Sequence, residues 1–238
     1  MSTQAGPVWG VMAALPEELG DLIHRFDHAQ VDRVAGRDFV HGQINGTRIV
    51  AVTSRIGKVA AALTASTLIE RHGVDHLVFV GVAGGLGEHV KRGDVVVATE
   101  LVQHDLSAWP LFPDGEIPLL GQTRLQADPS LTRQLTEAAQ LALVGTQRLH
   151  LGLIASGDRF IQGHALAQPI RQRHPDTLAV EMEGAAVAQV CVECGVPFAV
   201  LRTISDEADE TAAHDFMAFM RDTAAPLASR VLASLFPQ

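Results

Sequence analysis

The chain has 238 residues, of which 47% are hydrophobic and 19% are charged, so it can bury a core and does not have the composition of a disordered protein. Its net charge is −9, and no cluster of Lys or Arg marks a nucleic-acid surface. No stretch approaches 18 uncharged apolar residues and no signal-peptide pattern begins the chain, so we expect a cytoplasmic protein without a membrane span.

Apolar runs and helical patterns alternate along the chain. In the first half we expect strands at 8–14, 37–43, 47–54, 76–82 and 94–102, with helices from about 17 and at 57–71. Asn45 and Gly46 predict a tight hairpin turn. In the second half we expect a loop at 105–127, strands at 149–155, 178–182 and 197–204, and helices at 129–143, after 160, at 185–193 and at 214–235. Pro226 is expected to kink the last helix.

This order favours an α/β fold in one domain that spans 1–238, with its core at about 8–235. We expect three layers, α/β/α, in which helices cover both faces of a mixed but mostly parallel twisted sheet. Ligands of open α/β sheets bind outside the carboxyl ends of the strands. The residues at those ends are therefore the first candidates for a site.

Three acidic residues, Glu18, Glu183 and Asp206, stand where apolar runs stop. Carboxylates that meet at one sheet edge suit acid/base chemistry on a glycosidic bond. Each also has a structural interpretation. Glu18 lies in the first turn of a helix, where acids are common; Glu183 could pair with Arg202 inside the protein; and Asp206 could cap a turn together with Ser205.

Two further motifs are less specific. The glycines between Gly81 and Gly87 match neither a dinucleotide fingerprint nor a P-loop, and they indicate a tight turn at which backbone approaches a ligand. Cys191 and Cys194 have C-x-x-C spacing, but they fall inside a predicted helix with no second pair. We interpret them as buried thiols and expect no metal and no cofactor.

Seven segments together resemble the nucleoside phosphorylase/nucleosidase superfamily, and most closely its 5′-methylthioadenosine/S-adenosylhomocysteine nucleosidases. They are ALPEEL (14–19), SRIGKVAAA (54–62), GVAGGL (81–86), GDVVV (93–97), SGDRFI (156–161), VEMEGAAVAQVC (180–191) and RTISDEAD (202–209). The resemblance implies a homodimeric hydrolase that cleaves the N-glycosidic bond of a small nucleoside, releasing adenine and a free thioribose sugar.

The resemblance also implies roles for matched positions. Glu18 activates the attacking water, and Asp206, aided by Ser205, protonates N7 of the purine. Burial beside other acids should raise the pKa of Asp206 so that it holds a proton near neutral pH. The other matched positions are expected to bind substrate: Met182 and Glu183 the ribose, Phe160 and Ile161 the base, Phe216 the 5′ substituent, with Ile56, Val82, Ala83, Gly84 and Arg202 around them.

Several positions depart from the family pattern. Val82 replaces a residue with a hydroxyl, Leu15 replaces a methionine, and Arg55 stands where related nucleosidases often have glycine. The segment 104–120 also differs, and its apolar Trp109, Leu111 and Phe112 either reshape the 5′ pocket, across a dimer interface, or merely pack the loop. The preferred 5′ substituent is therefore left open.

Three rival functions remain. A purine or uridine phosphorylase needs a basic phosphate site; Phe79 occupies the position of its usual arginine, although Arg55 could supply a contact. A nucleosidase acting on futalosine or adenosine would use the same catalytic residues. A non-catalytic nucleoside-binding domain would bind without turnover. Free sugar as product indicates a hydrolase, and sugar 1-phosphate a phosphorylase.

Overall fold

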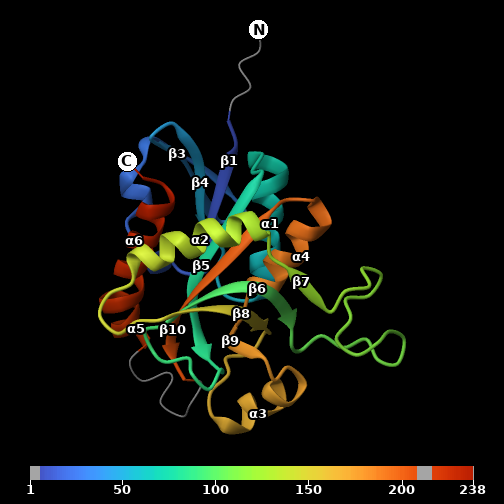
Figure 1. Cartoon of the computed structure of the whole chain (residues 1–238). Coiled ribbons are helices and arrows are strands. Elements are labelled where there is room, and N and C mark those ends of the chain that lie inside the picture. The colour runs from blue at the N-terminus through green and yellow to red at the C-terminus, as the bar shows by residue number, and fades with distance from the viewer. Residues whose placement is uncertain (1–5, 208–215, 238) are drawn as a thin grey trace.

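A computed structural model describes residues 6–207 and 216–237. Within these residues, ten strands form one mixed sheet (Figure 1). The strands are β1 (Val8–Ala13), β2 (Asp27–Val34), β3 (Arg37–Ile44), β4 (Thr47–Thr53), β5 (His76–Gly85), β6 (Val95–Gln103), β7 (Arg124–Gln126), β8 (Leu149–Ser156), β9 (Thr177–Glu181) and β10 (Phe198–Asp206). The α-helices are α1 (Lys58–His72), α2 (Pro129–Ala142), α3 (His164–Arg173), α4 (Gly184–Cys194), α5 (Phe216–Phe219) and α6 (Ala225–Leu235).

The sheet is mixed, as expected, but it is not mostly parallel. Its strand pairings divide into five parallel and five antiparallel in the described part of the chain. Short turns, including Asn45–Gly46, join β2, β3 and β4, and such turns impose antiparallel neighbours.

A closed ring of strands forms where β5 changes partners. β5 pairs with β1 through Trp9–His76 to Met12–Phe79, and then with β9 through Gly84 and Gly85, while β10 runs along its other edge. β10 also pairs with β6, β6 pairs with β8, and β8 pairs with β9. The strands β5, β10, β6, β8 and β9 therefore form a closed ring. Gly85 permits the close approach of β5 to β10, since a Cβ at Gly85 would lie 3.2 Å from the Ile204 side chain.

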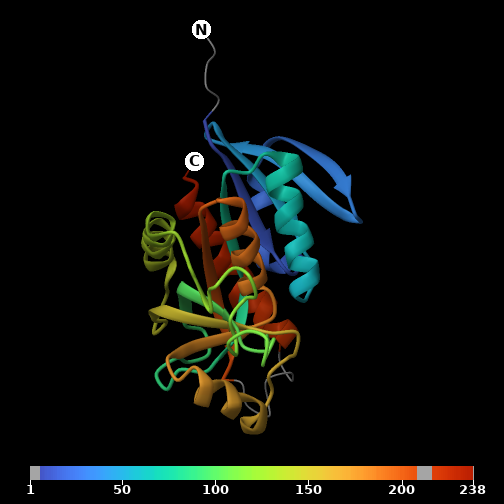
Figure 2. The same ribbon diagram turned by 90° about the vertical axis from the view of Figure 1, so that its right-hand side faces the viewer.

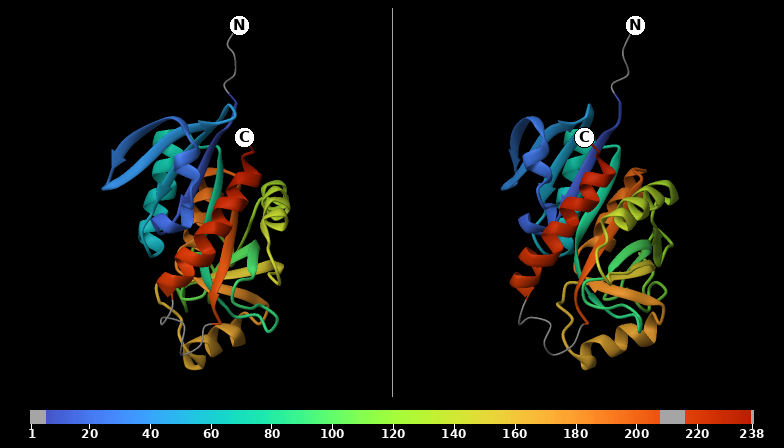
Figure 3. Two further views of the ribbon diagram at one scale, coloured as in Figure 1. Left: turned by 90° about the vertical axis from the view of Figure 1, so that its left-hand side faces the viewer. Right: turned by 60° about the vertical axis from the view of Figure 1, so that its left-hand side comes forward.

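Side chains on alternating strand positions build two cores. Met12 and Phe79 face a cluster that includes Leu68 of α1 and Val187 of α4. Their neighbours along the strands face a second cluster with α2 and α6. Helices therefore cover both faces of the sheet (Figures 2 and 3), and α1 packs on α4 while α2 packs on α6.

The structure differs from the expected elements at three places. β2 was not expected; it extends as a hairpin with β3 (Figure 2). The segment 105–127 is not a loop throughout, since it ends in β7. A π-helical turn, Met220–Ala224, interrupts the last helix just before α6. Pro226 lies in the first turn of α6, where its missing N–H is tolerated. The expected start of the last helix at 214 lies outside the described residues.

None of the helices found in residues 6–207 and 216–237 combines the length and apolar character needed to cross a membrane.

Candidate active site

A pocket of about 80 Å³ opens at the carboxyl ends of β1, β5, β9 and β10. This is the sheet edge at which the sequence predicted the site. The residues that line it are Ala14, Leu15, Glu18, Ile56, Val82, Ala83, Gly84, Glu181, Met182, Glu183, Ser205 and Phe216. Three of these twelve are glutamates, and none is Lys, Arg or His.

Glu18 occupies the third position of a short 3₁₀ helix, Pro16–Leu19, that directly follows β1. One carboxylate oxygen accepts hydrogen bonds from the amides of Ala14 and Leu15 at 2.8 and 2.7 Å, so the side chain caps this helix. The other oxygen accepts the Val82 amide at 3.0 Å. Burial raises the pKa of Glu18 although these amides oppose the shift. Glu18 thus combines the helix-start role with a place in the pocket.

A buried ion pair joins the lining residue Glu181, rather than Glu183, to an arginine behind the pocket. Nη2 of Arg202 donates to Oε2 of Glu181 at 2.7 Å, with 1% and 3% of the two side chains exposed. The Arg202 guanidinium also stacks over the Phe79 ring at 4.1 Å. The Ser156 hydroxyl and the backbone amides of Glu183 and Gly184 also donate hydrogen bonds to Glu181. The structural alternative, an ion pair with Arg202, therefore holds for Glu181 at the end of β9 and not for Glu183.

Glu183 follows two residues later as the N-cap residue of α4. Its Oε1 accepts the Gly57 amide, just before α1, at 2.7 Å. Burial, and next the negative charge of Glu181, raise the pKa of Glu183 to about 8. The protonated form of this carboxyl is therefore favoured near neutral pH, whereas Glu181 is paired with the Arg202 cation.

Asp206 ends β10 and is 7% exposed. Its Oδ2 lies 2.7 Å from the Ser205 hydroxyl, which also lies 3.3 Å from the Ala83 carbonyl oxygen. The hydroxyl has one hydrogen and can donate to one of these oxygens at a time. Ser205 lines the pocket, so it couples Asp206 to the same edge that carries Glu18 and Glu183.

Gly81 lets two charged groups approach across β5. A Cβ at this position would lie 2.9 Å from Oε1 of Glu18 and 3.3 Å from Nη1 of Arg202. Arg202 thus stands behind the pocket and stabilises the charged form of Glu18, without lining the cavity itself. Next along the strand, Val82 packs with Phe216 against Phe219 and forms an apolar side of the pocket.

Two residues predicted to bind the base lie elsewhere. Ile161 is buried in a separate apolar cluster with Leu86 and Val102. Phe160 is 45% exposed, and neither residue lines the pocket. Both belong to the segment between β8 and α3, which has no regular secondary structure. Their roles remain predictions.

Sequence reasoning also missed or misjudged some residues. Glu181 was noticed as an interruption of an apolar run but was not assigned to the site, although the same signal singled out Glu183. Arg55 does not line the pocket; its Nη2 donates to the Gly36 carbonyl oxygen at 3.0 Å, toward the β2–β3 turn.

Cys191 is buried as expected, but Cys194 is exposed. Within the described ranges, no group of three or more His, Cys, Asp or Glu residues is arranged to hold a metal ion.

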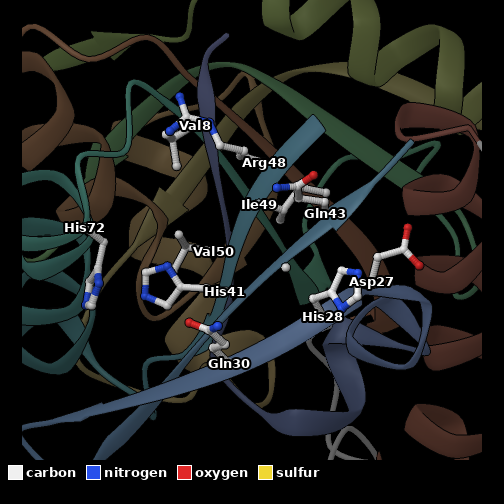
Figure 4. Close-up of a pocket in the computed structure, with 11 residues that line it drawn as sticks. Val8, Asp27, His28, Gln30, His41, Gln43, Arg48, Ile49, Val50 and His72 are labelled. Carbon is white, nitrogen blue, oxygen red and sulfur yellow. The ribbon is translucent and has the colours of Figure 1, made fainter. Parts of the chain in front are cut away.

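A larger cavity, of about 290 Å³, opens at the opposite ends of β1 and β4 (Figure 4). Its walls come from β2, β3, β4 and the last turn of α1, and the rings of His41 and His72 meet edge to face at 4.8 Å. None of the residues predicted to form the site lies in it. Cavity volume alone therefore does not single out the pocket that holds the predicted residues, since this cavity and the one of about 400 Å³ between α1 and α4 are both larger.

Comparisons with known proteins identify the family of this chain. The family model described as "Phosphorylase superfamily" matches residues 9–237. A 5′-methylthioadenosine/S-adenosylhomocysteine nucleosidase of Geobacillus thermodenitrificans is 35% identical over 94% of both chains. The structure of such a nucleosidase from Colwellia psychrerythraea, in complex with adenine, is 33% identical with a TM-score of 0.90, covering 97% of this chain and 94% of the other. A structure of futalosine hydrolase from Helicobacter pylori is 36% identical with a TM-score of 0.86, covering 96% and 97%. The chain therefore belongs to the phosphorylase superfamily and, within it, to the family of 5′-methylthioadenosine/S-adenosylhomocysteine nucleosidases.

Proposed function

We propose that the protein hydrolyses the N-glycosidic bond of 5′-methylthioadenosine, S-adenosylhomocysteine or a related 5′-modified adenosine, and releases adenine. The observation that carries this proposal is the set of carboxyl groups around the pocket. Glu18, Glu181 and Glu183 line it, and no basic side chain is among its described lining residues. Such a site favours a sugar that becomes positively charged, as the ribose does when its bond to the base breaks.

Each carboxyl group has a distinct part in the proposed reaction. Asp206, aided by the Ser205 hydroxyl, gives a proton to N7 of the purine, so the base leaves neutral. Glu183 binds the ribose hydroxyls, and it releases its proton to solvent as the substrate binds, so that its negative charge stabilises the cationic sugar. Glu18 holds the attacking water and takes up a proton as the water adds to the anomeric carbon. Attack from the face opposite the base inverts the configuration, by analogy with inverting glycosidases.

Phosphorolysis is the less favourable alternative. Phosphate carries up to two negative charges near neutral pH and is normally bound by Arg, Lys or backbone amides. In this pocket the amides of Ala14, Leu15 and Val82 already donate to Glu18. Arg202 donates to Glu181, and Arg55 lies outside the lining. Water is therefore the nucleophile that this site best accommodates.

The apolar side of the pocket bears on the 5′ substituent. Leu15, Ile56, Val82 and Phe216 contribute it, which favours a thioether or other weakly polar group over a free 5′ hydroxyl. Futalosine remains a second candidate substrate, because the Helicobacter pylori structure described as futalosine hydrolase is as similar to this chain as the methylthioadenosine nucleosidases are.

We test the function by product analysis. The purified protein is incubated with each of six nucleosides, with and without phosphate, and the released base and sugar are identified. The six are methylthioadenosine, S-adenosylhomocysteine, 5′-deoxyadenosine, adenosine, inosine and futalosine. We expect adenine and free sugar from the adenosine derivatives, at a rate independent of phosphate. Formation of sugar 1-phosphate would overturn the hydrolase assignment. Asp206→Asn should remove most turnover and leave the fold intact; near wild-type turnover would show that the proton donor is misassigned.

We also propose that the protein acts as a homodimer. Val59 and Leu63 on α1 are 80% and 47% exposed, and Leu111 in the segment after β6 is 84% exposed. Exposed apolar side chains that form a contiguous patch mark protein–protein interaction sites, and these three side chains are candidates for such a patch. Light scattering of the purified protein measures the assembly directly. The cytoplasmic location stays a prediction from the sequence.

A further inference from the structure

The first backbone amides at the start of α1 connect two other segments of the protein. The Gly57 amide donates to Glu183 at 2.7 Å, and the Lys58 amide donates to Oδ1 of Asp158 at 2.8 Å. Amides at a helix N-terminus have no partner within the helix and carry partial positive charge, so they bind carboxylates well. Gly57 has φ of +100°, a conformation that glycine adopts readily. The start of α1 therefore contacts both Glu183 and the segment after β8.

The Lys58 side chain closes these contacts into a ring. Its Nζ donates to Oδ1 of Asp105 at 2.6 Å and to Oε1 of Gln103 at 3.1 Å, both at the end of β6. The second oxygen of Asp105 accepts the Asp158 amide at 2.8 Å. Burial would raise the pKa of Asp105, but Lys58 and this amide hold it below its usual value. Only 17% of the Lys58 side chain is exposed.

The ring matters because the segment it holds has no helical or strand structure of its own. Residues 157–163 join β8 to α3 and contain Phe160. The segment packs tightly where it leaves β8, since a Cβ on Gly157 would collide with the His104 ring. Beyond that point, Asp158 makes the hydrogen bonds to Asp105 and Lys58 that fix its course.

We propose that Lys58 and Asp105 are positioning residues for the nucleoside site. They fix the start of α1, whose Gly57 amide orients Glu183, and the segment that presents Phe160 to the base. Neither side chain lines the pocket, so both act through other residues. This inference rests on the proposed nucleosidase function and adds a requirement to it. It also gives a role to Asp105, which the catalytic scheme leaves unused.

The test uses Lys58→Met, which keeps the length of the side chain and removes the charge, and Asp105→Asn, alone and combined. We expect kcat/KM for methylthioadenosine to fall about tenfold in each single variant, mostly through a higher KM, because the predicted contacts of Phe160 and Glu183 with the substrate lose their support. The double variant should lose little more than either single variant, since both remove one contact. Lys58→Arg should restore most of the affinity.

A matched control is available on the same helix. Arg71 lies in the last turn of α1, and its Nη2 contacts Oδ2 of Asp32 at 3.2 Å in an exposed ion pair. Arg71→Met should leave KM and kcat unchanged, and thermal unfolding of all variants should stay within a few degrees of wild type.

The outcomes separate this inference from the function on which it rests. If the wild type releases no base from any nucleoside, the proposed function fails and the inference fails with it. If the wild type turns over and Lys58→Met has an unchanged KM, only the positioning role is overturned. A fall in the active fraction with unchanged KM would likewise show that the ring only stabilises the fold. Additive losses of kcat/KM in the double variant would show the same.

Discussion

Glu183→Gln gives the most direct test of the electrostatics of this site. Glutamine has the shape of a protonated glutamate and keeps an oxygen that can accept the Gly57 amide. In the native protein, burial and the neighbouring Glu181 raise the pKa of Glu183 from 4.5 to about 8. The substitution therefore removes one titration and leaves the protonated form of the site nearly unchanged.

The sign and size follow from linkage between protonation and folding. A carboxyl group whose pKa is higher in the folded than in the unfolded state stabilises the fold when protonated. This contribution is fully present below pH 4.5 and is lost as the pH rises through about 8. Each unit of pKa corresponds to about 1.4 kcal/mol, so the loss reaches at most about 5 kcal/mol. The variant should match wild type near pH 5 and exceed it in stability near pH 9.

Urea unfolding at several pH values between 5 and 9 measures this difference, and subtracting wild type from variant cancels the titration of all other groups. Glu17→Gln, an exposed acid in the same turn as Glu18, controls for the loss of one negative charge. A free-energy difference that stays constant within about 1 kcal/mol over this range would refute the reasoning.

Two further outcomes are expected from the same set of contacts. Glu18→Gln keeps an acceptor for the Ala14 and Leu15 amides but cannot take a proton from water, so turnover should fall by about 10²–10⁴-fold in a base-release assay; wild-type turnover would exclude Glu18 as the base. Arg202→Leu leaves Glu181 buried without its cation and should cost about 3–5 kcal/mol in urea unfolding, whereas a loss below about 1 kcal/mol would mean that the pair is not needed.

Much of the fold could be predicted because most strands and helices bury apolar residues with a clear period. The expected strands at 47–54 and 149–155 and the helix at 129–143 lie within a residue of β4, β8 and α2. β2 could not be found in this way, since six of its eight residues are exposed and no face is apolar. Ring closure was hidden for a different reason: β5 meets β9 through Gly84 and Gly85, and glycines carry no side-chain pattern.

The site shows the same division. That Glu18 and Glu183 meet in one pocket, with Asp206 beside its Ser205, follows from the rule that ligands lie at the carboxyl ends of strands. Which glutamate takes Arg202 does not follow from spacing. Glu181 and Glu183 are two residues apart, and the choice depends on where β9 ends and α4 begins.

The pocket brings three glutamates together without a cation among its described lining residues, which would be unstable if all three were charged and unpartnered. Each is accommodated by a different means. Glu181 has Arg202, Glu18 has three backbone amides, and Glu183 holds a proton near neutral pH. When positive charge develops on a bound sugar, the last of these can lose its proton at little cost, because the new cation replaces it. Binding of a ribose analogue with a fixed positive charge should therefore release protons, whereas a neutral analogue should not. The same reasoning explains why this site suits water better than phosphate: its reserve of negative charge serves a cationic sugar and repels an anionic nucleophile.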